Sequence, residues 1–166
     1  KYLCVMTIQR MAIIRVHGQK SLAVLKTGQA TFGCVRAMLR LPDGRVLMAD
    51  MGKHCIYLID EDLDYLSMVA GVGEAGHCDG AALDAKFNGP CALALLPDGR
   101  VLVADFYNHR LRLLSADLQE VSTLAGDGVG GHRDGAAAQA LFNYPDGLAL
   151  LPDGRVLVAD SFNNRI

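Results

Sequence analysis

One heptapeptide occurs three times in this chain at a constant spacing of 55 residues. Residues 41–47 read Leu-Pro-Asp-Gly-Arg-Val-Leu, and the same seven residues recur at 96–102 and at 151–157. When 41–95 is laid over 96–150 without a gap, 30 of the 55 positions are identical. A fixed period of tens of residues indicates a solenoid, a propeller or another array of one structural unit. The chain is therefore built from repeats.

Each unit contains four short stretches that favour β-strands. In the most complete unit these are Ala92–Leu96, Arg100–Asp105, Arg110–Ser115 and Val121–Ala125, which are short, apolar and bounded by turn residues. Pro97-Asp98-Gly99 predicts a type I turn with a bulge, because Pro presets φ and Gly supplies the positive φ. Four antiparallel strands per unit make one blade.

The second strand of the unit is apolar on both faces, at Val101, Leu102 and Val103. A single sheet cannot cover two apolar faces, whereas blades stacked around an axis cover one another. No window shows a sustained apolar period near 3.6, which excludes helical repeats. The predicted fold class is all-β, a β-propeller of four-stranded antiparallel blades that is present as an incomplete fragment. The expected ring of six blades would need about 330 residues, so other blades of the parent chain are expected to close it.

The 55-residue step also assigns the ends of the chain. Shifting the pattern back places third and fourth strands at Tyr2–Val5 and Ala12–Ile14, and it aligns Phe32 with Phe87. We therefore expect one incomplete propeller domain made of four parts: a divergent partial blade at 1–33 with two strands and a connecting loop, blades at 34–88 and 89–143, and a partial blade at 144–166.

The unit read from Gly147 to Ile166, G-L-A-L-L-P-D-G-R-V-L-V-A-D-S-F-N-N-R-I, resembles the NHL repeat of β-propellers. The resemblance covers residues 34–166. Its recurring D-x-x-N-x-R turn is present twice, as Asp105, Asn108 and Arg110 and as Asp160, Asn163 and Arg165. The first unit has Lys53 and Cys55 at the Asn and Arg positions, so we expect that turn to be held differently. The resemblance implies a platform that binds protein or RNA.

Two long connections, Ala70–Pro90 and Ala125–Pro145, lead from one blade to the next. In such a blade this connection emerges on the same rim as the turn between the second and third strands. Long loops on a rigid scaffold are where binding groups usually lie. The candidate binding rim therefore comprises His77, Asp79, Asp105, Asn108, His109, His132, Asp134, Asp160 and Asn163.

The polar residues of this rim allow two interpretations. His and Asp side chains could bind a divalent metal, and Asp105 and Asp160 could act as catalytic carboxylates. Alternatively, the Asp side chains accept loop N–H bonds, and a residue repeated in each blade serves the architecture. The glycine-rich loops match neither a phosphate-binding nor a calcium-binding spacing. We favour the architectural interpretation and predict no catalytic residue, metal or cofactor.

Composition narrows the class of partner. The formal net charge of −2 gives no basic footprint for nucleic acid, and the apolar run Tyr2–Val16 is broken by Gln9, Arg10 and Arg15, so no membrane segment is predicted. Five cysteines without a C-x-x-C pair are expected to be reduced core residues, which favours an intracellular setting without assigning a compartment.

Three functions remain open. The first is a scaffold for protein–protein interaction with an unidentified protein partner. The second is part of a propeller enzyme, a metal-dependent lyase or a gluconolactonase-like hydrolase, for which other blades must supply nonrepeated His, Asp or Glu residues. The third is an RNA-binding platform, which would need a cationic rim.

Overall fold

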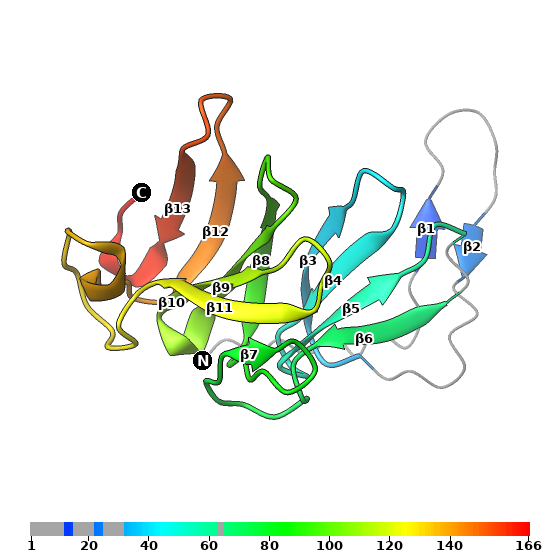
Figure 1. Ribbon diagram of the computed structural model, residues 1–166, viewed down its shortest axis with the longest axis horizontal. Helices are drawn as coiled ribbons and strands as arrows, with labels where there is room; N and C mark the ends of the chain where they lie inside the picture. The colour runs from blue at the N-terminus through cyan, green and yellow to red at the C-terminus, as the bar shows by residue number, and fades with distance from the viewer. Residues whose placement is uncertain (1–11, 15–21, 25–31, 63–64) are drawn as a thin grey trace.

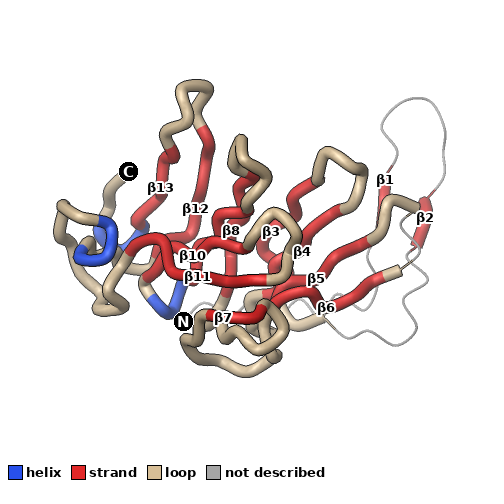
Figure 2. The backbone as a smooth tube through the Cα atoms, viewed as in Figure 1, coloured by secondary structure: helices blue, strands red, loops and turns tan. Residues whose placement is uncertain are grey.

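The computed structural model describes residues 12–14, 22–24, 32–62 and 65–166. The described elements are β-strands and three short 3-10 helices, η1 (Phe106–Asn108), η2 (Ala137–Gln139) and η3 (Ser161–Asn163). The strands form separate antiparallel sheets that follow one another along the chain and fan out in space (Figures 1 and 2). The predicted all-β fold with antiparallel propeller blades is confirmed.

The first complete sheet contains four strands in sequence order: β3 (Val35–Arg40), β4 (Val46–Asp50), β5 (Cys55–Ile59) and β6 (Leu66–Ala70). Each strand pairs antiparallel with the next, as expected for a blade whose strands are joined by short turns.

The second complete sheet repeats this order 55 residues later. Its meander consists of β8 (Pro90–Leu95), β9 (Val101–Asp105), β10 (Arg110–Leu114) and β11 (Glu120–Ala125). The predicted strands agree with these elements to within two residues at each end. Strand β8 begins earlier than expected, at Pro90, a position where a strand tolerates proline because its first residue can forgo an N–H bond.

A fifth strand on this sheet was not predicted. Strand β7 (Gly80–Ala81) belongs to the connection that leaves the first blade, and it pairs antiparallel with the outer strand β11. Its two residues lie in a glycine-rich stretch that gives no strand signal. The connection thus adds an edge strand to the next blade and ties the two blades together.

The last and first parts of the described chain contain two-stranded sheets. Strands β12 (Pro145–Leu150) and β13 (Val156–Asp160) pair antiparallel, as do β1 (Ala12–Ile14) and β2 (Leu22–Val24). Strand β1 coincides with a predicted strand, while the one predicted at Tyr2–Val5 lies outside the described residues. Strand β2 falls in the stretch expected to be a connecting loop, where Leu-Ala-Val is an apolar run that favours a strand.

The blades pack face to face, with the inner strand β8 between β3 and β12 (Figure 1). Val101 and Val103 of β9 face the first blade, in a core with Leu47, Ile56 and Phe87. The intervening Leu102 and Ala104 face the opposite way, in a second core. That core also contains Leu111 and Leu113 and contacts Leu148, Val156 and Val158 of the last sheet. The expectation that β9 is covered on both faces is confirmed.

The Pro-Asp-Gly turns have the predicted geometry. Gly44, Gly99 and Gly154 have φ angles of 96°, 87° and 88°. In each turn the following Arg is paired with the Asp two residues before it, at 2.7 Å. These hairpin tips lie on the upper side of the molecule in Figure 1, whereas the loop 71–89 lies on the lower side and the loop 126–144 lies at the left end.

No disulfide joins the cysteines in the described part of the chain. Cys55 and Cys91 are buried, and burial raises the pKa of their thiols to about 11 and about 12, so neither is a thiolate at neutral pH. Cys78 is exposed. None of the helices in the described ranges is long and apolar enough to cross a membrane.

Candidate binding rim

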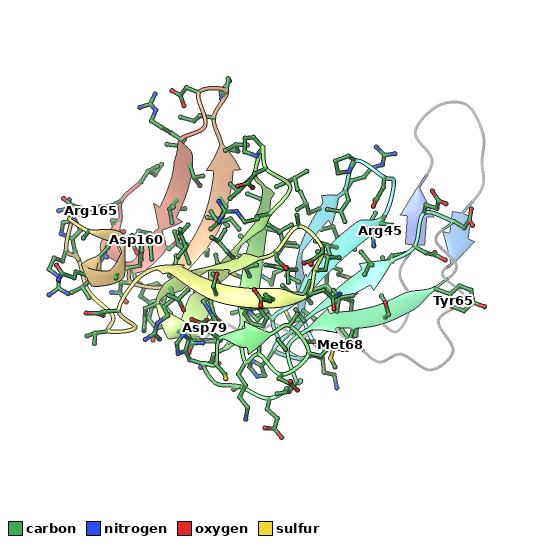
Figure 3. All side chains as sticks on the ribbon, viewed as in Figure 1. Arg45, Tyr65, Met68, Asp79, Asp160 and Arg165 are labelled. Carbon is green, nitrogen blue, oxygen red and sulfur yellow. The ribbon has the colours of Figure 1, made fainter. Side chains whose placement is uncertain are left out.

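The predicted rim residues all lie in the described part of the chain, on the inter-blade loops 71–89 and 126–144 or at the ends of β9 and β13. Asp79 lies on the first loop, and Asp160 lies beside Arg165 in the last unit (Figure 3). The role of the rim residues in binding stays a prediction.

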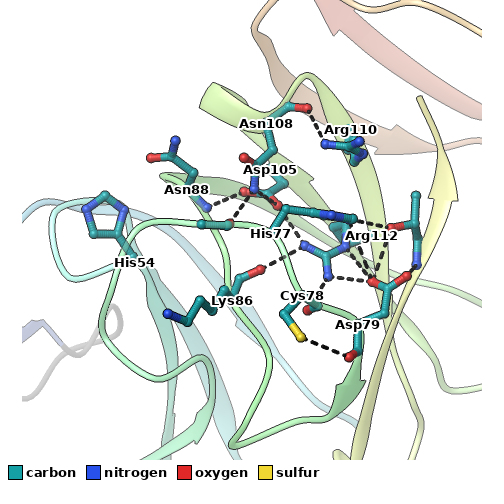
Figure 4. Close-up of polar contacts among 12 residues, drawn as sticks. His54, His77, Cys78, Asp79, Lys86, Asn88, Asp105, Asn108, Arg110 and Arg112 are labelled. Carbon is teal, nitrogen blue, oxygen red and sulfur yellow. Dashed lines mark hydrogen bonds and ion pairs between the residues drawn. The ribbon is translucent and has the colours of Figure 1, made fainter. Parts of the chain in front are cut away.

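Asp105 is fully buried at the end of β9 and is enclosed by donors. Its Oδ1 accepts the backbone N–H of Asn88 at 2.7 Å, and its Oδ2 accepts the Asn108 amide at 2.7 Å. Asn108 also donates to the carbonyl oxygen of Gly76 at 2.7 Å. The D-x-x-N pair therefore fastens the turn η1 to the loop that arrives from the preceding blade (Figure 4).

Arg112 completes this network, and the sequence analysis did not identify it. Its guanidinium is fully buried and donates to Asp105 at 2.8 Å and to Asp79 at 2.6 Å. It also donates to the carbonyl oxygens of Lys86 and Cys78 and lies 5.2 Å from the centroid of the Phe87 ring. A charged residue between two leucines of a strand is typical of a solvent-facing position. The inter-blade loop covers that face instead.

Asp79 is the second carboxylate bound to Arg112. Partial burial raises its pKa, but the hydrogen bond and charge of Arg112 and the bonds from Thr123 outweigh burial, so the pKa lies below its ordinary value. Its Oδ2 accepts the backbone N–H of Thr123 at 3.0 Å. Asp79 therefore fastens the loop to β11 and is held as a carboxylate.

The last unit repeats the turn but offers a more exposed loop. Asp160 accepts the backbone N–H of Asn143 at 2.6 Å and the amide of Asn163 at 2.6 Å, and Asn163 donates to the carbonyl oxygen of Gly131 at 2.7 Å. Asp134, the equivalent of Asp79, has a side chain that is 95% exposed. It lies 3.4 Å from His132.

The first unit holds its turn differently, as its departures from the D-x-x-N-x-R pattern predicted. Asp50 accepts four backbone N–H groups, at 2.8 to 3.0 Å. Lys53 takes the place of the turn Asn, and Tyr57 takes the place of Arg112. Tyr57 packs edge-on against Phe32, with ring centroids 6.0 Å apart, where Arg112 lies over Phe87.

His77 and Asp79 do not form a metal centre with other residues. His77 Nε2 lies 3.0 Å from the Thr123 hydroxyl and 4.0 Å from Asp79. Burial and the charges of Arg112 and Arg110 lower the pKa of His77. Across the described ranges, no group of three or more His, Cys, Asp or Glu side chains is placed to hold a metal ion.

His109 links two units through its ring. It occupies the left-handed position after η1, with φ 52°, and its Nδ1 accepts the backbone N–H of Tyr144 at 3.1 Å. The equivalent His54 accepts the backbone N–H of Gly89 at 3.1 Å. Both inter-blade junctions are thus closed by a histidine acceptor, a role that sequence patterns did not reveal.

An aromatic cluster on the rim was also missed. Rings from the turn η1, from the start of β12 and from η3 contact one another with centroids 4.6 to 6.5 Å apart, in edge-on or tilted arrangements. The outer two remain open to solvent, Tyr107 at 47% and Phe162 at 52% exposure. We call this set the aromatic ridge: Phe106, Tyr107, Tyr144 and Phe162. Its members are up to 56 residues apart in sequence, so only the fold brings them together.

A hollow of about 640 Å³ lies beside β13. Its lining includes Asp134, Phe142 and Asp160, which are equivalent to Asp79, Phe87 and Asp105 around Arg112. The hollow therefore corresponds to blade interior in the preceding unit.

Comparisons with known proteins agree with this architecture. The NHL repeat family model matches residues 87–112 and 142–166, and both stretches contain a complete D-x-x-N-x-R triplet. NHL repeat-containing protein 2 from Gallus gallus is 34% identical over 132 residues, which cover 78% of this chain and 16% of that protein. Protein SUPPRESSOR OF QUENCHING 1, chloroplastic, from Arabidopsis thaliana is 35% identical over 91 residues, which cover 55% of this chain and 9% of that protein.

Solved structures show the same fold. The crystal structure of an auxiliary nutrient binding protein from Bacteroides thetaiotaomicron aligns with a TM-score of 0.75 at 23% identity and covers 88% of this chain and 39% of that one. The corresponding protein from Bacteroides ovatus gives a TM-score of 0.76 at 23% identity, over 87% of this chain and 39% of that one. The chain thus spans only a minor part of the proteins that it matches. With its blades, its repeated Asp-centred turns and its two matched repeats, the chain carries NHL repeats on a β-propeller fold.

Proposed function

We propose that this chain is part of a non-catalytic scaffold for protein–protein interaction, and that its binding face is the rim that carries the aromatic ridge. The observation that supports this most directly is the exposure of Tyr107 and Phe162 at the two ends of a packed aromatic cluster. Aromatic residues are enriched at the centres of protein interfaces, where they supply much of the binding energy.

The different roles of the repeated and the nonrepeated residues also support this proposal. The repeated carboxylates Asp105 and Asp160 are buried and accept bonds from their own turns, so they build the scaffold. The ridge positions instead differ between units. Gly52, Tyr107 and Phe162 are equivalent, as are Met51, Phe106 and Ser161, and Gly89 and Tyr144. A rigid frame with unit-specific aromatic groups suits recognition of one particular surface.

The test is site-specific photo-cross-linking in the intact protein within its native cells. A photoreactive phenylalanine analogue is placed at Tyr107 or Phe162, and matched probes replace Asp98 and Asp153 in the exposed turns on the opposite rim. We expect one and the same protein to be captured from both ridge positions and from neither opposite-rim position.

Two outcomes would overturn the proposal. Capture of that protein from the opposite rim alone would move the binding face away from the ridge. Capture of RNA from the ridge, with binding that weakens steeply as salt rises, would assign the aromatic rings to base stacking.

A further inference from the structure

The centre of the aromatic ridge depends on one histidine. Tyr144 lies between Phe106 and Phe162, with ring centroids 4.8 and 4.6 Å away, and its backbone N–H is accepted by His109 Nδ1 at 3.1 Å. The imidazole ring of His109 also lies 4.4 Å from the Tyr144 ring. Because Nδ1 accepts this bond, it carries no proton, so His109 is neutral with its proton on Nε2.

Tyr144 is held in an unfavourable backbone conformation. Its φ is 55°, in the left-handed region that side chains other than those of Gly, Asn and Asp rarely adopt. Such a conformation persists only where the surroundings determine it. The bond to His109 is one of these determinants, so its loss would allow the backbone at Tyr144 to relax and carry the central ring with it.

The preceding junction is a natural control within the same chain. There His54 makes the same bond, to the N–H of Gly89. Gly89 has a φ of 73°, which glycine adopts without strain, and it carries no ring. Loss of the His54 bond would therefore release no strained aromatic residue. Gly89 packs against the Tyr107 ring, so the control is read at Tyr144.

The surroundings of His109 keep it neutral at neutral pH. Burial lowers its pKa, Arg110 from its own strand lowers it further, and Asp160 from β13 opposes them. The inter-blade loop contributes the Tyr144 phenol and the uncharged Asn143 and Gly130, which lie near the ring. A pH below the pKa of His109 in the folded protein would place a second ring proton on Nδ1, where it would face the N–H of Tyr144.

From this geometry we propose that His109 is a pH-sensitive latch on the aromatic ridge: its protonation breaks the bond to Tyr144 and moves the central ring of the ridge, while the equivalent bond from His54 holds Gly89, which has no ring. The biological consequence, loss of partner binding in mild acid, rests on the proposed function of the ridge. The structural change itself does not.

The test is NMR on the intact protein with 3-fluorotyrosine placed at position 144, titrated from about pH 8 to about pH 5. We expect the fluorine signal to shift with a single midpoint below the ordinary histidine value of 6.5, equal to the midpoint of the His109 ring protons. His109→Asn should give a signal that does not respond in this range, because Asn does not titrate. Asn164 holds the same left-handed position in the last unit, with φ 54°, so the substitution suits the backbone. His54→Asn should titrate like the wild type.

The proposal is overturned if the signal at position 144 stays constant while the His109 ring titrates in the wild-type protein, a result that requires no variant. It is also overturned if the shift persists in His109→Asn. Neither result bears on the cross-linking experiment, which is carried out at neutral pH with His109 in its bonded form. Failure of the latch and failure of the binding face are therefore distinguishable.

Discussion

Arg112 is the residue on which the junction between the two complete blades depends most strongly. It connects Asp105, at the end of β9, with Asp79, in the loop from the preceding blade, and all three side chains have their polar groups paired. Removing one partner of a buried ion pair costs more than the pair contributes, because the remaining charge stays buried without compensation.

We therefore predict that Arg112→Met lowers the free energy of unfolding of the intact protein by about 3 kcal/mol or more, measured by denaturant titration. The double variant with Arg112→Met and Asp105→Asn should lose less stability than the sum of the losses in the two single variants. The reason is that Asp105→Asn removes the carboxylate that Arg112→Met leaves unpaired. Arg100→Met, which breaks an exposed pair, is the matched control and should leave stability unchanged. An unchanged free energy of unfolding in Arg112→Met would show that the junction is held mainly by other contacts.

A second prediction at this scale concerns pH. The pKa of His109 in the folded protein lies below its ordinary value of 6.5, so between these two values the unfolded chain binds more protons than the folded one. Its contribution to stability is fully present above pH 6.5 and is lost as the pH falls through the folded pKa. The difference in the free energy of unfolding between wild type and His109→Asn should shrink as the pH falls through this window. The pH dependence that His77 contributes is the same in both proteins and cancels in the comparison. A stability difference between wild type and His109→Asn that does not change with pH would contradict the assignment of this pH dependence to His109.

Sequence patterns predicted some of the residues that hold the junctions and missed others. Asp105 and Asn108 stood out because they recur with the period of the repeat, and the structure uses both in the turn. Arg112 did not, because a charged residue alternating with leucines suggests a solvent face, and only the tertiary fold brings a loop over it. The aromatic ridge left no signal at all, since Tyr107 and Tyr144 meet only after two blades have packed.

At the scale of elements, the repeat predicted the strands because each is repeated with its turn. Strand β7 was missed because two residues of a glycine-rich loop have no strand pattern of their own; their pairing with β11 is imposed from outside. The hairpin turns, in contrast, were predicted with their backbone conformation, because Pro-Asp-Gly has few alternatives.

Gly99→Val and Gly154→Val test these turns as a matched pair. Both glycines have a positive φ, near 87° and 88°, which a β-branched residue adopts at a cost of about 1 kcal/mol or more. A Cβ at Gly99 would lie 3.2 Å from the Ala116 Cβ, whereas a Cβ at Gly154 meets nothing within 4 Å. Thermal unfolding should show both variants destabilised and Gly99→Val the more so. Equal melting temperatures for Gly99→Val and wild type would refute the turn geometry.

At the scale of the whole molecule, stability comes from blades that cover one another. Strand β9 buries one set of residues against the first blade and the alternate set against the last sheet. Strand β13 has β12 on one side, while its other edge borders the hollow lined by Leu157 and Ile166, which are 42% and 88% exposed. An open strand edge with exposed apolar residues is a site for association.

We predict that the 166-residue chain expressed by itself self-associates, and that sedimentation velocity at increasing concentration shows growing oligomers. Replacing Leu157 by Lys, a charged residue at this edge, should reduce the association. A monodisperse monomer at all concentrations would show that this edge is already protected.

The most direct test of the account is the affinity of the intact protein for the partner captured at the ridge. Tyr107→Ala should raise the Kd at least tenfold, which corresponds to about 1.4 kcal/mol, at a temperature where the variant is fully folded. Asp98→Ala, on the opposite rim, should leave the Kd unchanged. If Tyr107→Ala binds like the wild type while Asp98→Ala weakens binding, the aromatic ridge is not the binding face.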